Sequence, residues 1–182
     1  ESELVYLYRR ELSMPDGKQT WHIHELDLGV VSDDVYLVIG STGVNAPTSK
    51  QVAKVANMLK QNPDRMEEIE TIGKIARRGI DALISGDYDA VGRTMTENQI
   101  MLKSIGVSSP ELDALIKAAA PSSLGAKLTG AGGGGCMVAL TKNPKITSDA
   151  IELAGGRTLI SKLGSTGMMI NSPNNAAFWT KK

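Results

Sequence analysis

The sequence predicts a two-layer α+β fold in which helices pack on one face of an antiparallel sheet. The first observation is the order of patterns along the chain: strand patterns occupy residues 3–40, helical patterns residues 48–120, and strand patterns return after residue 125. The second is that strands and helices are segregated rather than alternating, which argues against a doubly wound parallel sheet. The third is a composition of 41% hydrophobic and 22% charged residues, which is typical of a globular domain.

Three strands are expected at the start of the chain. Residues 4–8 are apolar and aromatic, and a Pro-Asp-Gly turn separates them from residues 21–26, which alternate with period two. Residues 35–39 form a continuous apolar run of the length expected for a buried central strand. His22 and His24 share one strand face, a spacing that can bind metal, but no Cys or acidic cluster completes a site. We interpret this pair as exposed and inert.

Four helices are expected in the middle of the chain. The first has the capping-box form, with Thr48 as N-cap and Gln51 at the third helical position. The second begins near Asp64, the third stops at Gly106, and the fourth starts with Ser109 as N-cap before a proline and a glutamate. The side chains expected to face inward from the first two helices are Val52, Val55, Ala56 and Leu59, followed by Ile69, Ile72, Ala76, Ile80 and Leu83.

Strands are expected again in the last third of the chain. Two strands flank a glycine run, and the second of them, residues 136–140, should be central together with residues 35–39 in a sheet of about four strands. Thr147 or Ser148 is the expected cap of a short helix that ends near residue 154. Two further short strands are expected, at residues 157–160 and 168–170.

Composition and charge exclude several classes of protein. Lys plus Arg and Asp plus Glu both number 20, so the formal net charge is zero, whereas a protein that binds nucleic acid through phosphates normally carries a basic excess. No apolar run approaches the roughly 18 residues that a membrane helix requires. The single cysteine, Cys136, excludes an intramolecular disulfide. We therefore expect a cytoplasmic protein with no nucleic-acid or membrane partner.

The segment with specific chemistry is a glycine loop. Five of the 19 glycines lie within residues 130–135. Glycine loses more conformational entropy on ordering than any other residue, so five together indicate a backbone that adopts positive φ repeatedly or approaches a ligand closely. Successive N–H groups in such a backbone form an anion-binding concavity, and phosphate is the usual guest. A flexible linker is disfavoured because apolar strands adjoin the loop on both sides.

Three familiar glycine motifs fit this loop poorly. A Walker A loop requires Lys and Ser or Thr where Cys136 and Met137 stand. The spacing of Gly130, Gly132 and Gly135 matches a dinucleotide fingerprint, but a strand follows it where that motif requires a helix. A protein-kinase glycine loop lies between strands, yet the chain has no His-Arg-Asp or Asp-Phe-Gly segment.

Residues 125–136, Gly-Ala-Lys-Leu-Thr-Gly-Ala-Gly-Gly-Gly-Gly-Cys, resemble the third conserved motif of the GHMP kinases. Residues 39–55 and 95–113 are also similar to the C-terminal half of these enzymes. Thr129 before the glycines and Cys136 after them most resemble the mevalonate kinase branch of the family. The resemblance implies a ferredoxin-like sheet and an ATP-dependent, Mg-dependent kinase of a small alcohol, here mevalonate converted to phosphomevalonate for isoprenoid precursor synthesis.

The resemblance covers only the C-terminal portion of such an enzyme. It implies that residues 1–34 are strands left over from the N-terminal half, that residues 35–171 are the C-terminal-type domain and that residues 172–182 are a tail. No serine-rich phosphate loop, metal-binding Glu or catalytic Asp is present, so these are expected in the missing half. The fragment should be inactive alone, and its protein partner should be a second copy or a complementing N-terminal half. The alternative is a non-catalytic binding or regulatory module with the same fold.

The loop and its neighbours are the candidate phosphate- and substrate-binding residues. The glycine N–H groups would bind the phosphoryl group, and Thr129 and Lys127 share a strand face beside them. Asn98 is expected to point inward from the third helix and needs a partner, because an unpaired buried amide costs roughly 1–3 kcal/mol. Cys136 is interpreted as a packing residue. The full set is Asn98, Lys127, Thr129, Gly130, Ala131, Gly132, Gly133, Gly134 and Gly135.

Overall fold

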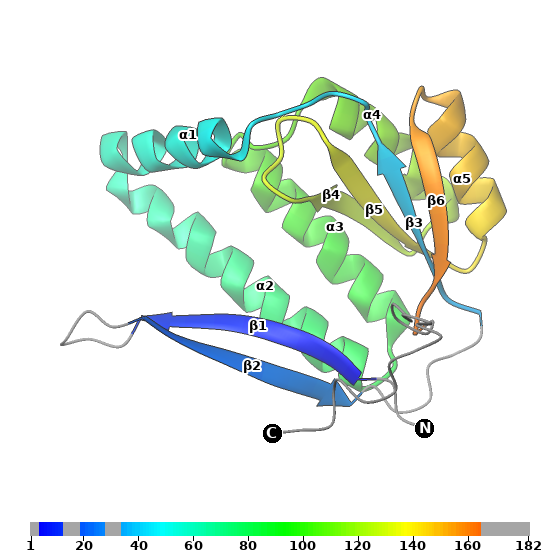
Figure 1. Cartoon of the computed structure of the whole chain (residues 1–182), viewed down its shortest axis with the longest axis horizontal. Helices are drawn as coiled ribbons and strands as arrows, with labels where there is room; N and C mark the ends of the chain where they lie inside the picture. Colours follow the sequence, from blue (N-terminus) through cyan, green and yellow to red (C-terminus); the bar gives the residue numbers. More distant parts are fainter. Residues whose placement is uncertain (1–3, 13–18, 28–33, 165–182) are drawn as a thin grey trace, which may run out of the picture.

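The computed structural model describes residues 4–12, 19–27 and 34–164 of the 182-residue chain (Figure 1). Strands β1 (Leu4–Leu12) and β2 (Gln19–Asp27) pair antiparallel, with Leu4 opposite Asp27. The strand expected at residues 168–170 and the tail of residues 172–182 lie outside the described residues.

A four-stranded antiparallel sheet forms the centre of the molecule. Its order is β4-β5-β3-β6, so β3 (Tyr36–Ser41) and β5 (Cys136–Thr141) are central as expected. The edges are β4 (Gly125–Thr129) and β6 (Arg157–Lys162). Every pairing is antiparallel. The predicted α+β fold, with its sheet of four antiparallel strands, is confirmed.

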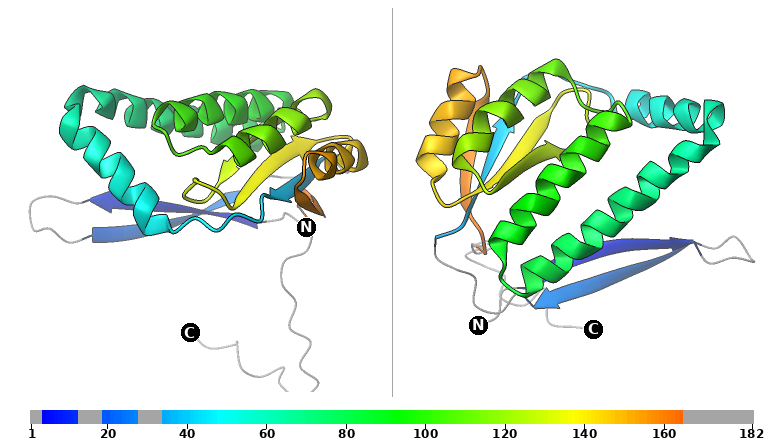
Figure 2. Two further views of the ribbon diagram at one scale, coloured as in Figure 1. Left: turned by 90° about the horizontal axis from the view of Figure 1, so that it is seen from above. Right: turned by 180° about the vertical axis from the view of Figure 1, so that it is seen from behind.

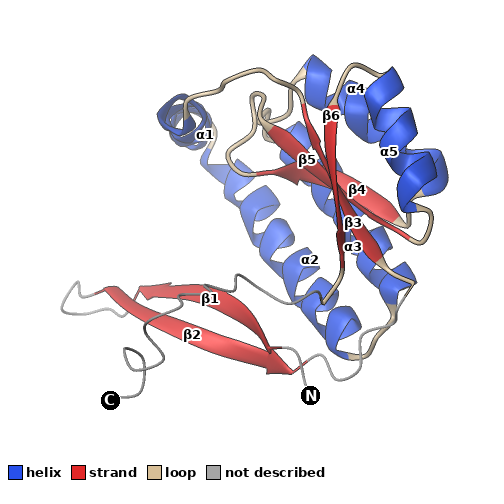
Figure 3. Ribbon diagram, turned by 45° about the vertical axis from the view of Figure 1, so that its right-hand side comes forward, coloured by secondary structure: helices blue, strands red, loops and turns tan. Residues whose placement is uncertain are grey.

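Helices lie on one side of this sheet (Figures 1 and 2). Helices α4 and α5 contact the strands across the face, whereas α3 runs along the edge strand β4 and α2 lies beside α3. Coloured by structure type, the sheet and its helical layer are distinct in Figure 3. The helices are α1 (Thr48–Gln61), α2 (Met66–Ile84), α3 (Tyr88–Ser104), α4 (Pro110–Ala119) and α5 (Pro144–Leu153), with 3-10 turns η1 (Pro63–Arg65) and η2 (Ala120–Ser122).

The core lies between the sheet and these helices. Alternation along β3, β4 and β5 sends every second side chain into it, as period-two strands require. Helices α4 and α5 contribute the opposite wall through Leu112, Leu115 and Ile151. The buried strand residues of this cluster are Val38, Ala126, Leu128, Met137 and Ala139.

The predicted start of α4 is confirmed, but the predicted caps of α1 and α5 are wrong. Ser109 is the N-cap of α4, and its hydroxyl accepts from Leu112 N–H. Pro47 is the N-cap residue of α1 and makes no side-chain cap bond, so Thr48 is already helical. Proline at the first position starts α5 one turn earlier than predicted, which leaves Thr147 and Ser148 buried inside that helix.

Two predicted inward faces are also corrected. Helix α1 has no fully buried residue: Val55 and Leu59 are partly buried, with Val55 packed against the core, whereas Val52 is 62% exposed and Ala56 is exposed, because the helix projects from the sheet (Figure 1). On α2 the buried position is Ile75, whereas Ala76 is exposed. Periodicity identified the apolar side of each helix, but burial depends on whether a partner element meets it.

Candidate functional site

The glycine loop connects β4 to β5 and has the backbone that its composition predicts. The φ angles of Gly130, Gly132, Gly133, Gly134 and Gly135 are 82°, 83°, 74°, 149° and 76°. This region of φ is unfavourable for residues that carry a Cβ atom. The five glycines are therefore required by the conformation of the loop.

Two of these glycines are also required by close packing against backbone carbonyl oxygens, and a third packs against the end of a side chain. A Cβ atom on Gly132 would lie 2.0 Å from the carbonyl oxygen of Val107, and one on Gly133 would lie 2.1 Å from Nε2 of Gln51. A Cβ atom on Gly134 would lie 2.8 Å from a further backbone carbonyl oxygen. At Gly130 and Gly135, by contrast, a Cβ atom would meet nothing within 4 Å. The loop thus has a packed inner side and an open outer side.

Hydrogen bonds fix the inner side of the loop. Gly133 N–H donates to Val107 O over 2.7 Å, and Gly135 N–H donates to Val44 O over 2.8 Å. Thr42 donates to the carbonyl oxygen of Gly135 through both its backbone N–H and its hydroxyl, each at 2.9 Å. These bonds join the loop to the segments that follow β3 and α3.

The inner bonds correct the expectation that all glycine N–H groups are available to an anion. Those of Gly133 and Gly135 are already engaged by carbonyl oxygens. The N–H groups of Gly130, Ala131, Gly132 and Gly134 make no hydrogen bond to the described residues. The loop therefore offers a subset of its donors, on a backbone whose shape is already set.

The N-terminus of α1 adjoins this loop. The side chain of Gln51, in its first turn, meets the position of Gly133, and Ala46 just before the helix lies close by. No acidic side chain occupies the first turn of α1, and no side chain caps it. Uncapped N–H groups at a helix N-terminus carry positive partial charge, so α1 adds to the attraction for an anion at the loop.

Thr129 and Lys127 occupy the strand that enters the loop. Thr129, at the end of β4, is exposed and lies opposite Cys136. Lys127 is partly buried; its Nζ donates to Leu128 O over 2.8 Å, and burial lowers the pKa of its amine. Alternation along β4 places both side chains on the same face, as predicted.

Lys127 and Asn98 both line a groove between α2 and α3. The groove has a volume of about 270 Å³, and its walls are mostly apolar, with Ile75 and Met95 among the lining residues. Asn98 is partly buried there. The structure thus brings Asn98 close to Lys127 rather than to the glycines.

The buried amide of α3 belongs to Gln99 and not to Asn98, which corrects the prediction from periodicity. Gln99 is 7% exposed, and its Oε1 accepts from the backbone N–H of Leu128 at 2.9 Å. Asn98 lies with Met95 on the side of α3 that faces α2. Gln99 lies on the side that faces β4. Sequence periodicity could not distinguish these two neighbours of α3.

Two remaining predictions concern Cys136 and the histidines. Cys136 is a free, partly buried cysteine at the start of β5. His22 and His24 lie opposite Arg9 and Leu7 in the hairpin. In the ranges that the structure describes, no group of three or more His, Cys, Asp or Glu side chains is arranged to hold a metal ion.

The fold and the glycine loop agree with the protein family that part of the chain matches. Residues 80–152 match the family described as GHMP kinases C terminal. The chain therefore carries a GHMP kinase C-terminal domain, as its glycine motif predicted. No helix among the described residues is long and apolar enough to cross a membrane.

Curated relatives that the chain matches include several named mevalonate kinase. The Pyrococcus furiosus mevalonate kinase is 36% identical over 142 residues, which is 74% of this chain and 42% of that protein. The Thermococcus onnurineus mevalonate kinase is 37% identical over the same shares of each chain. The chain thus spans less than half the length of these curated relatives.

Solved structures agree with this assignment. The L. major mevalonate kinase in complex with R-mevalonate aligns with a TM-score of 0.67 and 32% identity, over 82% of this chain and 43% of that one. The Streptococcus pneumoniae phosphomevalonate kinase in complex with phosphomevalonate and AMPPNP has the same TM-score at 19% identity, over 79% of this chain and 43% of that one. The second likeness shows the fold alone.

Proposed function

We propose that this chain is the C-terminal portion of an ATP-dependent mevalonate kinase and that its glycine loop binds the phosphoryl groups of ATP. Mevalonate is the proposed acceptor, the product is phosphomevalonate, and the site of action is the cytoplasm. The observation that carries the proposal is the loop itself. Its five glycines have positive φ, and carbonyl oxygens of Val107 and Val44 hold the N–H groups of Gly133 and Gly135, while the other loop N–H groups make no bond to the described residues.

The chemistry of phosphoryl transfer suits this arrangement. Catalysis consists mostly of positioning and of stabilising charge on the phosphoryl oxygens. In the proposed site, the N–H groups of Gly130, Ala131, Gly132 and Gly134 donate to phosphate oxygens, and the Thr129 hydroxyl donates at the mouth of the loop. Bound ATP supplies the transferred group. A preset backbone needs no reorganisation when charge develops.

The remaining chemistry belongs, in this function, to an N-terminal portion of the enzyme. The Mg²⁺ ligands and the group that accepts the proton of the mevalonate hydroxyl are expected there, because the described residues offer no cluster of metal-binding side chains. Asn98 and Lys127 are proposed to contact substrate from the groove between α2 and α3. The portion that completes the site comes either from a longer chain or from a separate one.

An activity assay tests this function. The chain alone and a fusion, in which the N-terminal portion of the Pyrococcus furiosus mevalonate kinase precedes it, are assayed for ADP release with mevalonate and Mg-ATP. We expect turnover by the fusion and none by the chain alone above about 0.1 per second, the low end of typical enzyme rates. An inactive but folded fusion would favour the non-catalytic binding module instead.

A binding experiment tests the loop separately from catalysis. The chain is titrated with tripolyphosphate while its backbone amides are followed by NMR. The amide signals of Gly130, Ala131, Gly132 and Gly134 should shift most, and those of Gly133 and Gly135 least, because carbonyl oxygens already engage the latter. Shifts centred on surface lysines far from the loop would contradict the assignment.

A further inference from the structure

Gln99 is a buried side chain that joins the two segments on which the glycine loop depends. It lies in the middle of α3 and is 7% exposed. Its amide oxygen accepts from Leu128 N–H at 2.9 Å, and its amide nitrogen donates to the Ser108 hydroxyl at 3.2 Å. Leu128 is in the strand that enters the loop, and Ser108 is next to Val107, which anchors the loop.

The first bond satisfies the free edge of β4. This strand pairs with β5 on one side only, so backbone groups on its other side need partners. Helix α3 approaches that edge so closely that a Cβ atom on Gly125 would lie 1.9 Å from the carbonyl oxygen of Gly92. Gln99 therefore provides Leu128 N–H with an acceptor that the sheet cannot provide.

The second bond fixes the segment after α3. The Ser108 hydroxyl donates to Oδ1 of Asp113 at 2.7 Å, so it accepts from the Gln99 amide nitrogen. Lys103 pairs with the same carboxylate at 2.7 Å. Burial alone would raise the pKa of Asp113, but the hydrogen bonds from Lys103 and Ser108 and the charge of Lys103 lower it. The chain of bonds thus runs from β4 through Gln99 to the start of α4.

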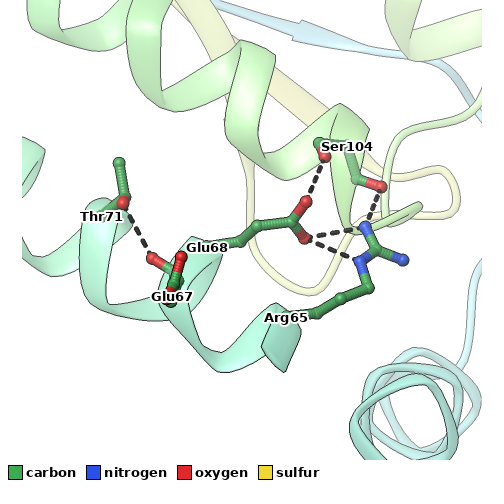
Figure 4. Close-up of polar contacts among 5 residues, drawn as sticks. All are labelled: Arg65, Glu67, Glu68, Thr71 and Ser104. Atoms are coloured by element: carbon green, nitrogen blue, oxygen red, sulfur yellow. Dashed lines mark hydrogen bonds and ion pairs between the residues drawn. The ribbon is translucent and has the colours of Figure 1, made fainter. Parts of the chain in front are cut away.

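The C-terminal end of α3 is held independently by α2 (Figure 4). The Glu68 carboxylate accepts from the Ser104 hydroxyl at 2.8 Å and from Arg65 at 2.7 Å, and Arg65 also donates to Ser104 O at 2.8 Å. Lys54 of α1 donates to the carbonyl oxygen of Gly106. These contacts limit the movement of α3 as a body. Val107 is also buried, and its N–H donates to Leu102 O, so the bond at Ser108 adds to these restraints on the Val107 carbonyl.

We propose that Gln99 is a positioning residue for the glycine loop. It fixes Leu128 before the loop and, through Ser108, the Val107 carbonyl that holds Gly133. That the positioned loop binds phosphate rests on the proposed function; that Gln99 positions it does not. Gln99 does not bond to the loop itself. Its partners are Leu128 and Ser108, so it acts on the loop N–H groups through the backbone.

Hydrogen exchange of single amides tests the proposal in the 182-residue chain. Gln99→Met keeps the length of the side chain but removes both bonds. We expect exchange at Leu128 and Gly133 to accelerate by about tenfold, as the loss of roughly one net hydrogen bond implies. Gly135, which is held by Val44, should change little. Unchanged exchange at Gly133, or equal acceleration at Gly135 and in the core, would overturn the positioning role.

Two further variants make the test specific. Ser108→Ala should accelerate exchange at Gly133 and leave Leu128 protected, because it removes the bonds of the Ser108 hydroxyl to Gln99 and Asp113 but keeps the bond between Gln99 and Leu128. Thr94→Val is the matched control on the same helix: Thr94 is buried, and among the described residues its hydroxyl bonds to Val91 O within α3. It should affect neither amide. If Thr94→Val mimics Gln99→Met, the effect is a general loosening of α3 and the proposal fails.

The fusion enzyme connects the loop to catalysis. There Gln99→Met should lower kcat/KM for ATP by about tenfold while KM for mevalonate changes less than twofold, because the loop faces phosphate. Equal effects on both substrates would contradict this role. If the unsubstituted fusion has no activity, the proposed function fails, but the exchange experiment still decides the role of Gln99.

Discussion

At the scale of single residues, the glycines of the loop fall into two groups that a sequence cannot separate. Gly132, Gly133 and Gly134 abut the backbone and side chains of residues distant in sequence, whereas Gly130 and Gly135 face open space. A valine at position 133 would meet both a positive φ and the Gln51 side chain. Such a variant would disturb the packed side of the loop as well as any ligand, so an open position gives the cleaner experiment.

Gly130→Ala is that cleaner substitution, and Gly86→Ala is its matched control. The two glycines have φ angles of 82° and 72°, and a Cβ atom on either meets nothing within 4 Å. Each substitution should destabilise the chain by about 1 kcal/mol through backbone strain. Only Gly130→Ala should weaken tripolyphosphate binding, by about tenfold, as measured by NMR titration. Equal affinity in both variants would mean that phosphate does not contact the open side of the loop.

Lys127 gives a prediction for pH. Burial holds the pKa of its amine below the ordinary value of 10.5, so the folded state binds this proton less tightly than the unfolded state does. Stability therefore rises with pH between the folded and unfolded pKa values, where the unfolded chain holds more protons. The contribution is unfavourable and constant below that window.

The measurement compares the chain with Lys127→Met. Urea unfolding from pH 7 to pH 10 should show the unsubstituted chain gaining stability relative to the variant as pH approaches 10. A difference that stays constant over this range would mean that the Lys127 amine is effectively solvated. Exposed lysines titrate alike in both proteins and cancel.

At the scale of elements, the sheet and most helices were predictable because their signals are local. Strand alternation and the Ser109 cap act over a few residues, and both predictions are confirmed. The caps of α1 and α5 were misplaced because Pro47 and Pro144 set those helix starts. The sequence does not predict which element packs against each face of a helix. Whether Asn98 or Gln99 meets β4 depends on how α3 lies against both α2 and the sheet.

The candidate site was predictable to a similar extent. Composition alone predicted positive φ angles, since no other residue adopts them at low cost. The acceptors of Gly133 and Gly135 are the backbone carbonyl oxygens of Val107 and Val44. Every residue has such a carbonyl, whatever its side chain. No sequence pattern can therefore assign which loop donors are engaged. The Lys127 groove likewise depends on α2, which is distant in sequence.

Helix α4 supplies a stability prediction at the same scale. Leu112 is fully buried between α4 and the sheet, whereas Leu153 at the end of α5 is 91% exposed. Leu112→Ala should reduce the free energy of unfolding by about 2–5 kcal/mol, and Leu153→Ala by less than about 0.5 kcal/mol. Urea unfolding measures both. Comparable losses in the two variants would place the core elsewhere.

At the scale of the whole molecule, charge balance and exposed apolar surface act together. The formal net charge is zero, and the sequence pI is about 7.0. Val52, Ile100 and Leu159 are each more than half exposed, on α1, α3 and β6. A protein without net charge has little long-range repulsion to oppose association through such residues.

Solubility should therefore pass through a minimum near pH 7. Lowering the pH to 5 gives the chain a net positive charge and raising it to 9 gives it a net negative charge, so either change restores repulsion between molecules. Light scattering at fixed concentration and ionic strength measures the association.

Adding charge at pH 7 by Val52→Glu should lower scattering, both by giving the chain a net charge and by interrupting the apolar face of α1. The matched change Lys50→Glu, two residues away on the exposed side of the same helix, alters net charge by two units but leaves that face intact. If apolar contact drives association, Val52→Glu will be the more effective variant although it adds less charge; if Lys50→Glu is the more effective, charge alone controls it.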